Sequence, residues 1–307
     1  MKRFYIKIVW FLLPVLLVGV GLEVFYQTTA TNYTYKTRQI STAYNDSELL
    51  IFGNSHALYG LDPSYFSMRT FNIANISQSL YFDELLLHKH QPNLPHLKAV
   101  VFTISYFSLS QEDNTSEDTW RKYFYHQQMD LEVPIISDFD LRKYSMALAR
   151  RFNKSVALIQ EYTKEGTIVS CYPNGFGKQD ENDIVEDKEA ITPIIVKKHE
   201  DGLMDFSTNE ARLKRMIELC EAANIKVFLV EMPVYKGYYD ALRKEKVAKI
   251  MSTLASLESN YSNVTYLKLS QNPLFNERDL RDADHLTNEG AKKCSMLLNT
   301  ELKKILD

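Results

Sequence analysis

The chain has 307 residues, a formal net charge of −3 and an apolar fraction of 45%, so it is long enough for one large α/β domain or two small ones and has the composition of an ordinary globular protein. No basic stripe stands out, so the electrostatic footprint of a nucleic-acid-binding protein is missing. The three cysteines, Cys171, Cys220 and Cys294, fall in no zinc-binding spacing. We therefore expect no nucleic-acid partner, no metal and no organic cofactor.

An apolar segment opens the chain. Three basic residues precede an uninterrupted apolar run at 8–22, and Glu23 is the first acid after them. With its flanking aromatic residues the run is just long enough to span a bilayer, and the basic residues before it place the N-terminus in the cytoplasm. We predict a single-pass anchor over residues 1–27 in a bacterial inner (cytoplasmic) membrane, with the remaining chain extracytoplasmic. A cleaved signal peptide ending near Ala30 is the alternative, and it would secrete the domain.

The next segments show where the domain begins. Residues 28–47 are polar and rich in Thr, Asn and Tyr, which is typical of a short tether. Short apolar runs at 48–52 and 70–74 predict strands, apolar spacing predicts a helix over 80–89, and residues 97–105 read as a buried strand. We therefore expect the folded domain to span residues 48–307.

The middle of this domain is less regular. Helical periodicity is present over 141–162, whereas residues 169–193 mix glycine, proline and acids, so we expect an insertion or lid around 111–205. Order returns with expected helices at 210–223, 244–257 and 288–305 and strands at 226–231 and 264–269. Strands that alternate with helices predict a three-layer α/β/α sandwich around a parallel, flavodoxin-like sheet, preceded by one transmembrane helix.

A serine follows the first predicted strand. Residues 51–56 read Ile-Phe-Gly-Asn-Ser-His, so Gly53 permits a tight turn and Ser55 begins the next helix. Ligands of doubly wound sheets bind at the carboxyl ends of the strands, where free N–H groups at a helix start stabilise negative charge. The same letters also form an ordinary turn and helix cap.

A second motif precedes the last predicted helix. Asp282 lies three residues before His285, so its carboxylate can hold one imidazole nitrogen while the other takes a proton from a serine. This is the pattern that a Ser-His-Asp triad requires. The alternative is that Asp282 and Asp284 are loop acids and that Asn288 only caps the helix.

Together, the two motifs resemble the first and last sequence blocks of the SGNH (GDSL-like) hydrolase superfamily. The resemblance covers the chain from about Glu48 to its end, apart from the insertion. It implies that Ser55 is the nucleophile and that Asp282 and His285 complete the catalytic triad. Asp284, which is adjacent to His285, is the less favoured partner.

The two middle blocks of the superfamily are matched less well. Residues 71–79 resemble the second block, with Ala74 and Ser77 in its glycine positions, and a serine still supplies a backbone N–H to an oxyanion hole. The third block, Gly-x-Asn-Asp, is absent from residues 104–108, and with it an asparagine donor. The resemblance implies an oxyanion hole built from Ser55 and Ser77.

Three side chains are open as replacements for the missing asparagine. They are Asn54, Asn75 and Ser105, and the spacing does not choose among them. We include Asn75 in the expected oxyanion hole. Losing such a donor costs about a hundredfold or more in rate, so the departure bears on activity more than on the fold.

The layout also resembles an envelope-anchored branch of the superfamily. Its membrane-tethered members acylate cell-surface polymers and include teichoic-acid D-alanylation and alginate O-acetylation proteins. The resemblance implies an extracytoplasmic serine esterase or O-acyltransferase that acts on an acylated glycan or other envelope polymer, with a membrane-bound acyl-donor protein as partner for transfer. The alternative is a non-catalytic SGNH-fold protein that binds polysaccharide or scaffolds an assembly at the membrane.

Overall fold

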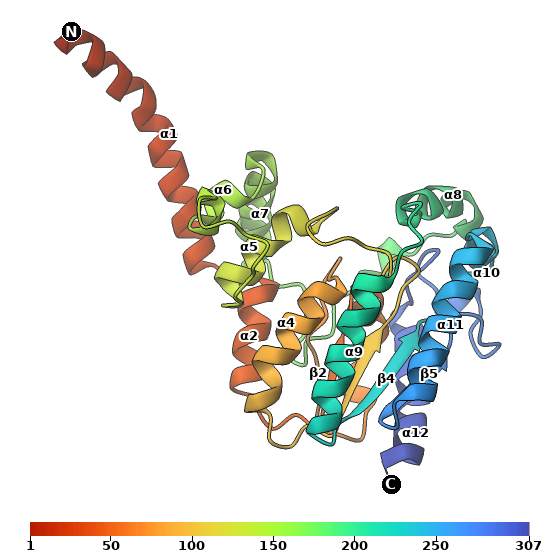
Figure 1. The fold of residues 1–307 in the computed structure, drawn as a ribbon. Helices are drawn as coiled ribbons and strands as arrows, with labels where there is room; N and C mark the ends of the chain where they lie inside the picture. Colours follow the sequence, from red (N-terminus) through yellow and green to blue (C-terminus); the bar gives the residue numbers. More distant parts are fainter. Residues whose placement is uncertain (307) are drawn as a thin grey trace. The chain divides into compact units, whose positions relative to one another are not determined.

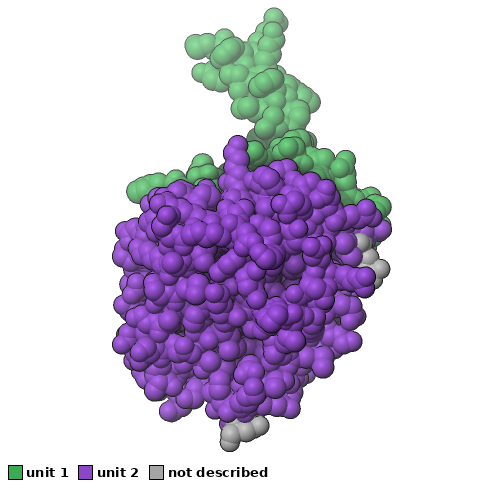
Figure 2. Space-filling model, turned by 90° about the vertical axis from the view of Figure 1, so that its right-hand side faces the viewer, with its two compact units in different colours: residues 1–37, 116–170 green, residues 38–115, 171–307 purple. Residues whose placement is uncertain are grey.

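A computed structural model of the chain describes residues 1–306, without the side chain of Glu181, and divides into two compact units. Unit 1 contains residues 1–37 and 116–170, and unit 2 contains residues 38–115 and 171–307 (Figure 2). Helix α2 (Asn32–Ser41) contains the boundary near residue 37.

Unit 2 is built on one parallel sheet of five strands in the order β2-β1-β3-β4-β5. Its strands are β1 (Leu49–Phe52), β2 (Thr70–Asn72), β3 (Ala99–Thr103), β4 (Lys226–Glu231) and β5 (Val264–Lys268). Strand β1 pairs with both β2 and β3, so Leu49 lies beside Thr70 on one side and Ala99 on the other. This strand order is that of flavodoxin-like sheets and confirms the expected fold class.

Helices cover both faces of the sheet, and this explains why the central strands are apolar throughout. All residues of β1 and β3 are buried. Alternate residues such as Leu49, Ile51 and Val101 form one core with Ala57 of α3 and Leu298 of α12, whereas α4 and α9 pack together on the opposite face (Figure 1). The loops that follow β1 and β3 therefore begin at the carboxyl ends of strands that are buried and tightly packed.

The elements of unit 2 outside the sheet are mainly helices. They are α3 (Ser55–Gly60), α4 (Leu80–His90), α8 (Lys188–His199), α9 (Ser207–Ala222), α10 (Lys236–Ala241), α11 (Lys244–Asn260) and α12 (Asn288–Leu306), with 3₁₀ turns η1 (Pro63–Tyr65), η2 (Gln91–Asn93), η4 (Glu181–Asp183) and η5 (Glu277–Asp279).

Unit 1 joins the N-terminal helix to a helical segment from the middle of the chain. Its other elements are α1 (Lys2–Thr28), α5 (Asp118–Gln128), η3 (Leu141–Lys143), α6 (Met146–Ala149) and α7 (Phe152–Glu165). The continuous stretch 2–41 is the one candidate membrane span found among the described residues, by length and composition. It could serve as an anchor or as a signal sequence.

The strands fall where the sequence predicts them, but three other segments differ. The expected tether contains α2, and the periodic stretch 141–162 is broken into η3, α6 and α7. The expected insertion is divided, because residues 116–170 belong to unit 1 and residues 171–205 to unit 2. Part of the irregular stretch is α8, whose start is capped because the Asp187 side chain accepts a hydrogen bond from the N–H of Ala190.

Candidate active site

The turn after β1 fixes the position of Ser55. Gly53 has a φ of +126°, and a Cβ there would lie 2.1 Å from Oγ1 of Thr103, so both the backbone and the packing require glycine. The side chain of Asn54 accepts a hydrogen bond from the N–H of His56 and caps α3. Ser55 therefore stands half-buried at the first position of a helix, where backbone N–H groups have no acceptor within the helix.

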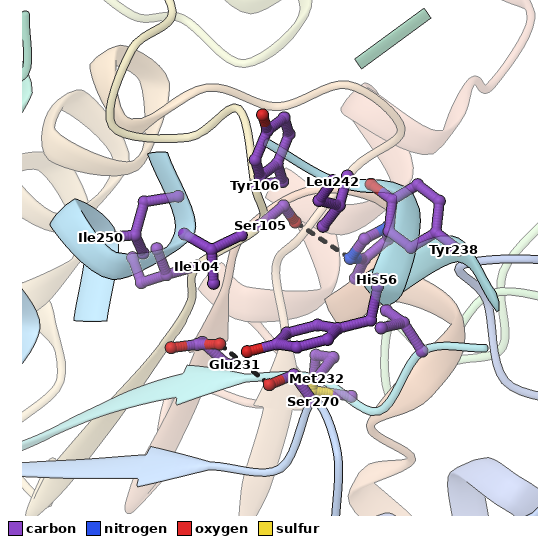
Figure 3. Close-up of a pocket in the computed structure, with 13 residues that line it drawn as sticks. His56, Ile104, Ser105, Tyr106, Glu231, Met232, Tyr238, Leu242, Ile250 and Ser270 are labelled. Atoms are coloured by element: carbon purple, nitrogen blue, oxygen red, sulfur yellow. Dashed lines mark hydrogen bonds between the residues drawn. The ribbon is translucent and has the colours of Figure 1, made fainter. Parts of the chain in front are cut away.

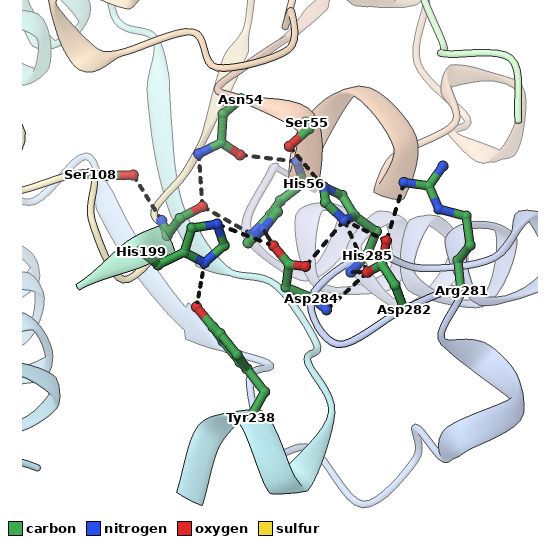
Figure 4. A network of polar contacts seen from close by, with 11 residues as sticks. Asn54, Ser55, His56, Ser108, His199, Tyr238, Arg281, Asp282, Asp284 and His285 are labelled. Atoms are coloured by element: carbon green, nitrogen blue, oxygen red, sulfur yellow. Dashed lines mark hydrogen bonds and ion pairs between the residues drawn. The ribbon is translucent and has the colours of Figure 1, made fainter. Parts of the chain in front are cut away.

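The loop before α12 brings His285 to this serine. Nε2 of His285 lies 2.8 Å from Oγ of Ser55, and Nδ1 lies 3.0 Å from each carboxylate oxygen of Asp282 (Figure 4). Asp282 also accepts the backbone N–H groups of Asp284 and His285, at 3.0 and 2.8 Å. This tight turn is why an acid three residues before a histidine can hold its ring. The three predicted residues meet with the geometry of a Ser-His-Asp triad.

A second set of buried side chains supports the first. Nε2 of His56 lies 2.9 Å from Oδ2 of Asp284, and Nδ1 lies 3.0 Å from Oγ of Ser105, which in turn accepts a hydrogen bond from Asn54 at 2.8 Å. Oδ1 of Asp284 lies 3.3 Å from Nδ1 of His285. Asp284 therefore contacts both imidazole rings, a role that we did not foresee from the sequence.

His199 closes this network from the end of α8. Its Nδ1 lies 2.8 Å from the hydroxyl of Tyr238, and its Nε2 lies 3.7 Å from Oδ2 of Asp284. Burial lowers the pKa of His199 to about 4 and raises the pKa of Tyr238 well above its ordinary value. The neutral His199 ring thus accepts a hydrogen bond from the Tyr238 hydroxyl and directs its own N–H toward Asp284.

Two carboxylates determine the charge state of His285. Burial disfavours its charged form, but attraction to Asp284 and the hydrogen bond that the ring donates to Asp282 outweigh burial and raise the pKa of His285 to about 9. Burial alone would raise the pKa of both carboxyls. The contacts with His285 outweigh it, so the pKa of Asp282 lies below its ordinary value and that of Asp284 lies well below it. The site therefore stabilises a proton on His285.

The expected oxyanion donors differ in their surroundings. Ser77, in the turn after β2, has a φ of +55°, a conformation that suits the glycine of the second SGNH block. Asn75 is 2% exposed, and its Nδ2 has no hydrogen-bond partner among the described residues. Asn54 and Ser105 are bonded to each other and to His56, so Asn75 is the side chain with a donor to spare.

A mainly apolar pocket adjoins the network at the carboxyl ends of β3, β4 and β5. His56 and Ser105 form part of its wall, and Glu231 and Ser270 form a polar patch through a 3.0 Å hydrogen bond (Figure 3). The apolar lining includes Ile104, Met232, Val234, Leu242, Val247 and Ile250. The pocket can hold a small apolar group beside a histidine.

Three side chains of the polar network are close enough to share a metal ion. His56, Asp284 and His285 each offer one ligand atom, and these atoms lie within 4.8 Å of one another. Hydrogen bonding already accounts for their positions, because Asp284 pairs with His56 and Nδ1 of His285 is held by Asp282. We therefore interpret the group as a polar network.

No protein-family model and no curated protein matches the chain. Solved structures with a similar fold include a GDSL-like lipase from Bacteroides thetaiotaomicron (12% identity, TM-score 0.42, 88% of this chain and 98% of the other covered). A second is a “putative acylhydrolase” from Bacteroides fragilis (14% identity, TM-score 0.40, 86% of this chain and 89% of the other covered). A third is a “putative platelet activating factor” from Streptococcus pneumonia (13% identity, TM-score 0.40, 96% of this chain and 99% of the other covered).

Proposed function

We propose that the protein is a serine esterase or O-acyltransferase in which Ser55, His285 and Asp282 form the catalytic triad. The observation that carries the proposal is the pair of contacts on His285, with Ser55 at 2.8 Å and Asp282 at 3.0 Å on opposite ring nitrogens. These residues come from segments about 230 positions apart and meet at the carboxyl edge of the sheet, where such folds place their reactive groups.

The reaction begins when Oγ of Ser55 attacks the acyl carbonyl and its proton passes to Nε2 of neutral His285. Asp282 holds the ring and stabilises the imidazolium that forms. The protonated His285 then gives its proton to the leaving oxygen, and an acyl-Ser55 intermediate remains. Water or a sugar hydroxyl attacks this ester, again with His285 as base, and restores the free serine.

The negatively charged oxygen of the tetrahedral intermediate must be stabilised by hydrogen-bond donors. We assign the backbone N–H groups of Ser55 and Ser77 and the side-chain Nδ2 of Asn75 to this task. The unpaired, buried Nδ2 of Asn75 and the glycine-like backbone of Ser77 support the assignment. Asn75 would thereby replace the asparagine that the third SGNH block lacks here.

We further propose that α1 anchors the chain in the bacterial inner membrane and that the catalytic unit works outside the cytoplasm. The basic residues before the apolar run support this orientation. Outside the membrane the substrate would be an acylated glycan or another envelope polymer, and a membrane-bound protein would supply acyl groups if transfer dominates. The small apolar pocket beside His56 suits a short acyl group.

Reaction of the purified protein with a fluorophosphonate probe tests the enzyme proposal. The wild type should be labelled, whereas Ser55→Ala should not, and His285→Ala should react far more slowly. Mass spectrometry after incubation with acetylated glycans and chromogenic acetyl esters would then distinguish hydrolysis from transfer. An unlabelled wild type that is inert toward all these esters would instead favour the polysaccharide-binding or scaffold function.

A further inference from the structure

The end of the apolar N-terminal helix is built into a folded unit. In unit 1, the Glu23 carboxylate accepts hydrogen bonds from Oγ of Ser145 and the N–H of Ala147, at 2.7 and 3.0 Å. The hydroxyl of Tyr26 lies 2.8 Å from Oγ of Ser155, and both side chains are buried. Cleavage after this helix would remove these contacts, so the geometry favours a retained anchor over a signal peptide.

These contacts also fix the depth of unit 1 relative to the apolar run. At 1.5 Å per residue, the helix from Phe4 to Glu23 is about 30 Å long, which matches the hydrocarbon core of a bilayer. Residues of α1 before Glu23 are almost all exposed to their surroundings in the protein. Glu23, held by the start of α6, therefore falls at the boundary where a spanning α1 would leave the membrane.

Helix α7 lies at this same boundary and is only partly covered by protein. Ser155 is its only buried residue among those described, and the ring of Tyr162 meets that of Phe25 in α1 edge-on, with centroids 5.8 Å apart. Phe152, Val156 and Ile159 recur at helical spacing on one face, where Phe152 is 60% exposed and Val156 and Ile159 are partly buried. The apolar face of α7 is therefore open at its start, at Phe152.

The segment that leads into α7 adds more exposed apolar side chains. They are Phe139, Leu141, Tyr144 and Leu148, with exposed fractions between 55% and 96%. Residues 138–154 also contain five basic and two acidic side chains. Exposed aromatic and aliphatic groups beside basic ones are typical of segments that lie in a membrane interface.

We infer that residues 139–162 form a platform that lies in the headgroup region of the membrane leaflet from which α1 emerges. The partner is the lipid bilayer, because the platform is continuous with the exit of α1 and carries the charge that anionic headgroups attract. Phe152 and the exposed apolar side chains that precede it would point into the lipid, and the side of α7 with Ala157 and Glu161 would face water. This inference rests on α1 spanning a bilayer, as proposed above, and does not depend on the esterase reaction.

Single-cysteine labelling of the full-length protein tests the platform. The three native cysteines are buried, so a polarity-sensitive NBD label should react only with introduced cysteines. Leu148→Cys and Phe152→Cys place the label at exposed apolar positions of the platform, and Ala157→Cys and Glu161→Cys are controls on the exposed side of α7 that faces away from Phe152. The labelled proteins are reconstituted into vesicles of phosphatidylcholine and phosphatidylglycerol.

We expect the labels at Leu148 and Phe152 to emit at shorter wavelength and to be quenched several-fold more by nitroxide-bearing lipids than the two controls. Aqueous iodide should quench the controls more strongly. Equal quenching on both faces would overturn the platform. Protection from iodide without quenching by lipid nitroxides would also overturn it and would indicate that a second copy of the chain covers α7. Release of the unlabelled protein from the vesicles by alkaline carbonate would instead refute the anchor.

Discussion

Replacement of Asp284 by asparagine should shift the pH dependence of the reaction without dismantling the triad. Asp284 is 3% exposed, contacts His285 at 3.3 Å and is the main cause that raises the pKa of His285 to about 9 against the effect of burial. Moving this pKa from its ordinary value of 6.5 to about 9 corresponds to about 3 kcal/mol in favour of the protonated ring. Asparagine keeps an acceptor for His56 but removes the negative charge.

The size of the shift follows from the distance. An opposite charge at this range moves a pKa by about 1–3 units, so we expect the pKa of His285 to fall by about 1–2 units in Asp284→Asn. Only neutral His285 can act as general base, and kcat/KM should therefore begin to rise at correspondingly lower pH. Asp282→Asn should differ, because it disturbs the ring orientation and should lower the limiting rate by about a hundredfold or more.

Two assays measure this shift independently. The pH profile of kcat/KM with a chromogenic acetyl ester gives the acidic limb, and NMR titration of the histidine nitrogens gives the pKa without requiring turnover. Asp279→Asn is the matched control, since Asp279 lies in the same loop but pairs with Lys293 at 2.8 Å. An acidic limb and a His285 titration that stay at the wild-type pH in Asp284→Asn would refute the electrostatic reasoning.

Three further predictions concern the same region. Asn75→Ala should lower kcat by about a hundredfold. The free energy of unfolding, measured with urea, should change by less than about 1 kcal/mol, because the lost Nδ2 has no hydrogen-bond partner among the described residues. An unchanged kcat would remove Asn75 from the oxyanion hole. Gly53→Ala should destabilise the fold by about 2–4 kcal/mol in urea melts, since its Cβ would meet Thr103; near wild-type stability would contradict the strained turn. Because the folded-state pKa of His285 is raised, the protonated ring should stabilise the folded protein fully below about pH 6.5, and this stabilisation should be lost as the pH rises through about 9. The free energies of unfolding of the wild type and His285→Ala should therefore differ more at acidic than at alkaline pH. A constant difference would argue against the raised pKa.

The sequence predicted the sheet well because its strands are short apolar runs bounded by turn residues, as in residues 97–105 around β3. It also predicted which distant residues meet, since Ser55 and His285 each follow a recognisable local motif. The sequence did not predict the buried network beside the triad, and the reason is physical. His56, Ser105 and Asp284 are single polar residues whose proximity depends on how β1, β3 and the last loop pack.

Unit 1 could not be predicted from local patterns. Residues 116–170 leave the main domain to pack with residues 1–37, and long-range contacts of this kind leave no periodic signal in either segment. The broken stretch 141–162 shows the same limit, because exposed apolar residues such as Leu148 mimic the pattern of a buried helix face. In the main domain, by contrast, the position of His56 directly after the nucleophile candidate Ser55 is a local sequence signal for the buried network.

Trapping of the acyl-enzyme tests the central claim most directly. The purified protein would be mixed with a chromogenic acetyl ester, quenched in acid within the first turnover, digested and mapped by mass spectrometry, with Ser55→Ala treated in parallel. The triad predicts one added acetyl group on the peptide that contains Ser55 in the wild type and none on the corresponding peptide of the variant. An acetyl group found reproducibly on another residue, or ester turnover by Ser55→Ala at the wild-type rate, would contradict the account.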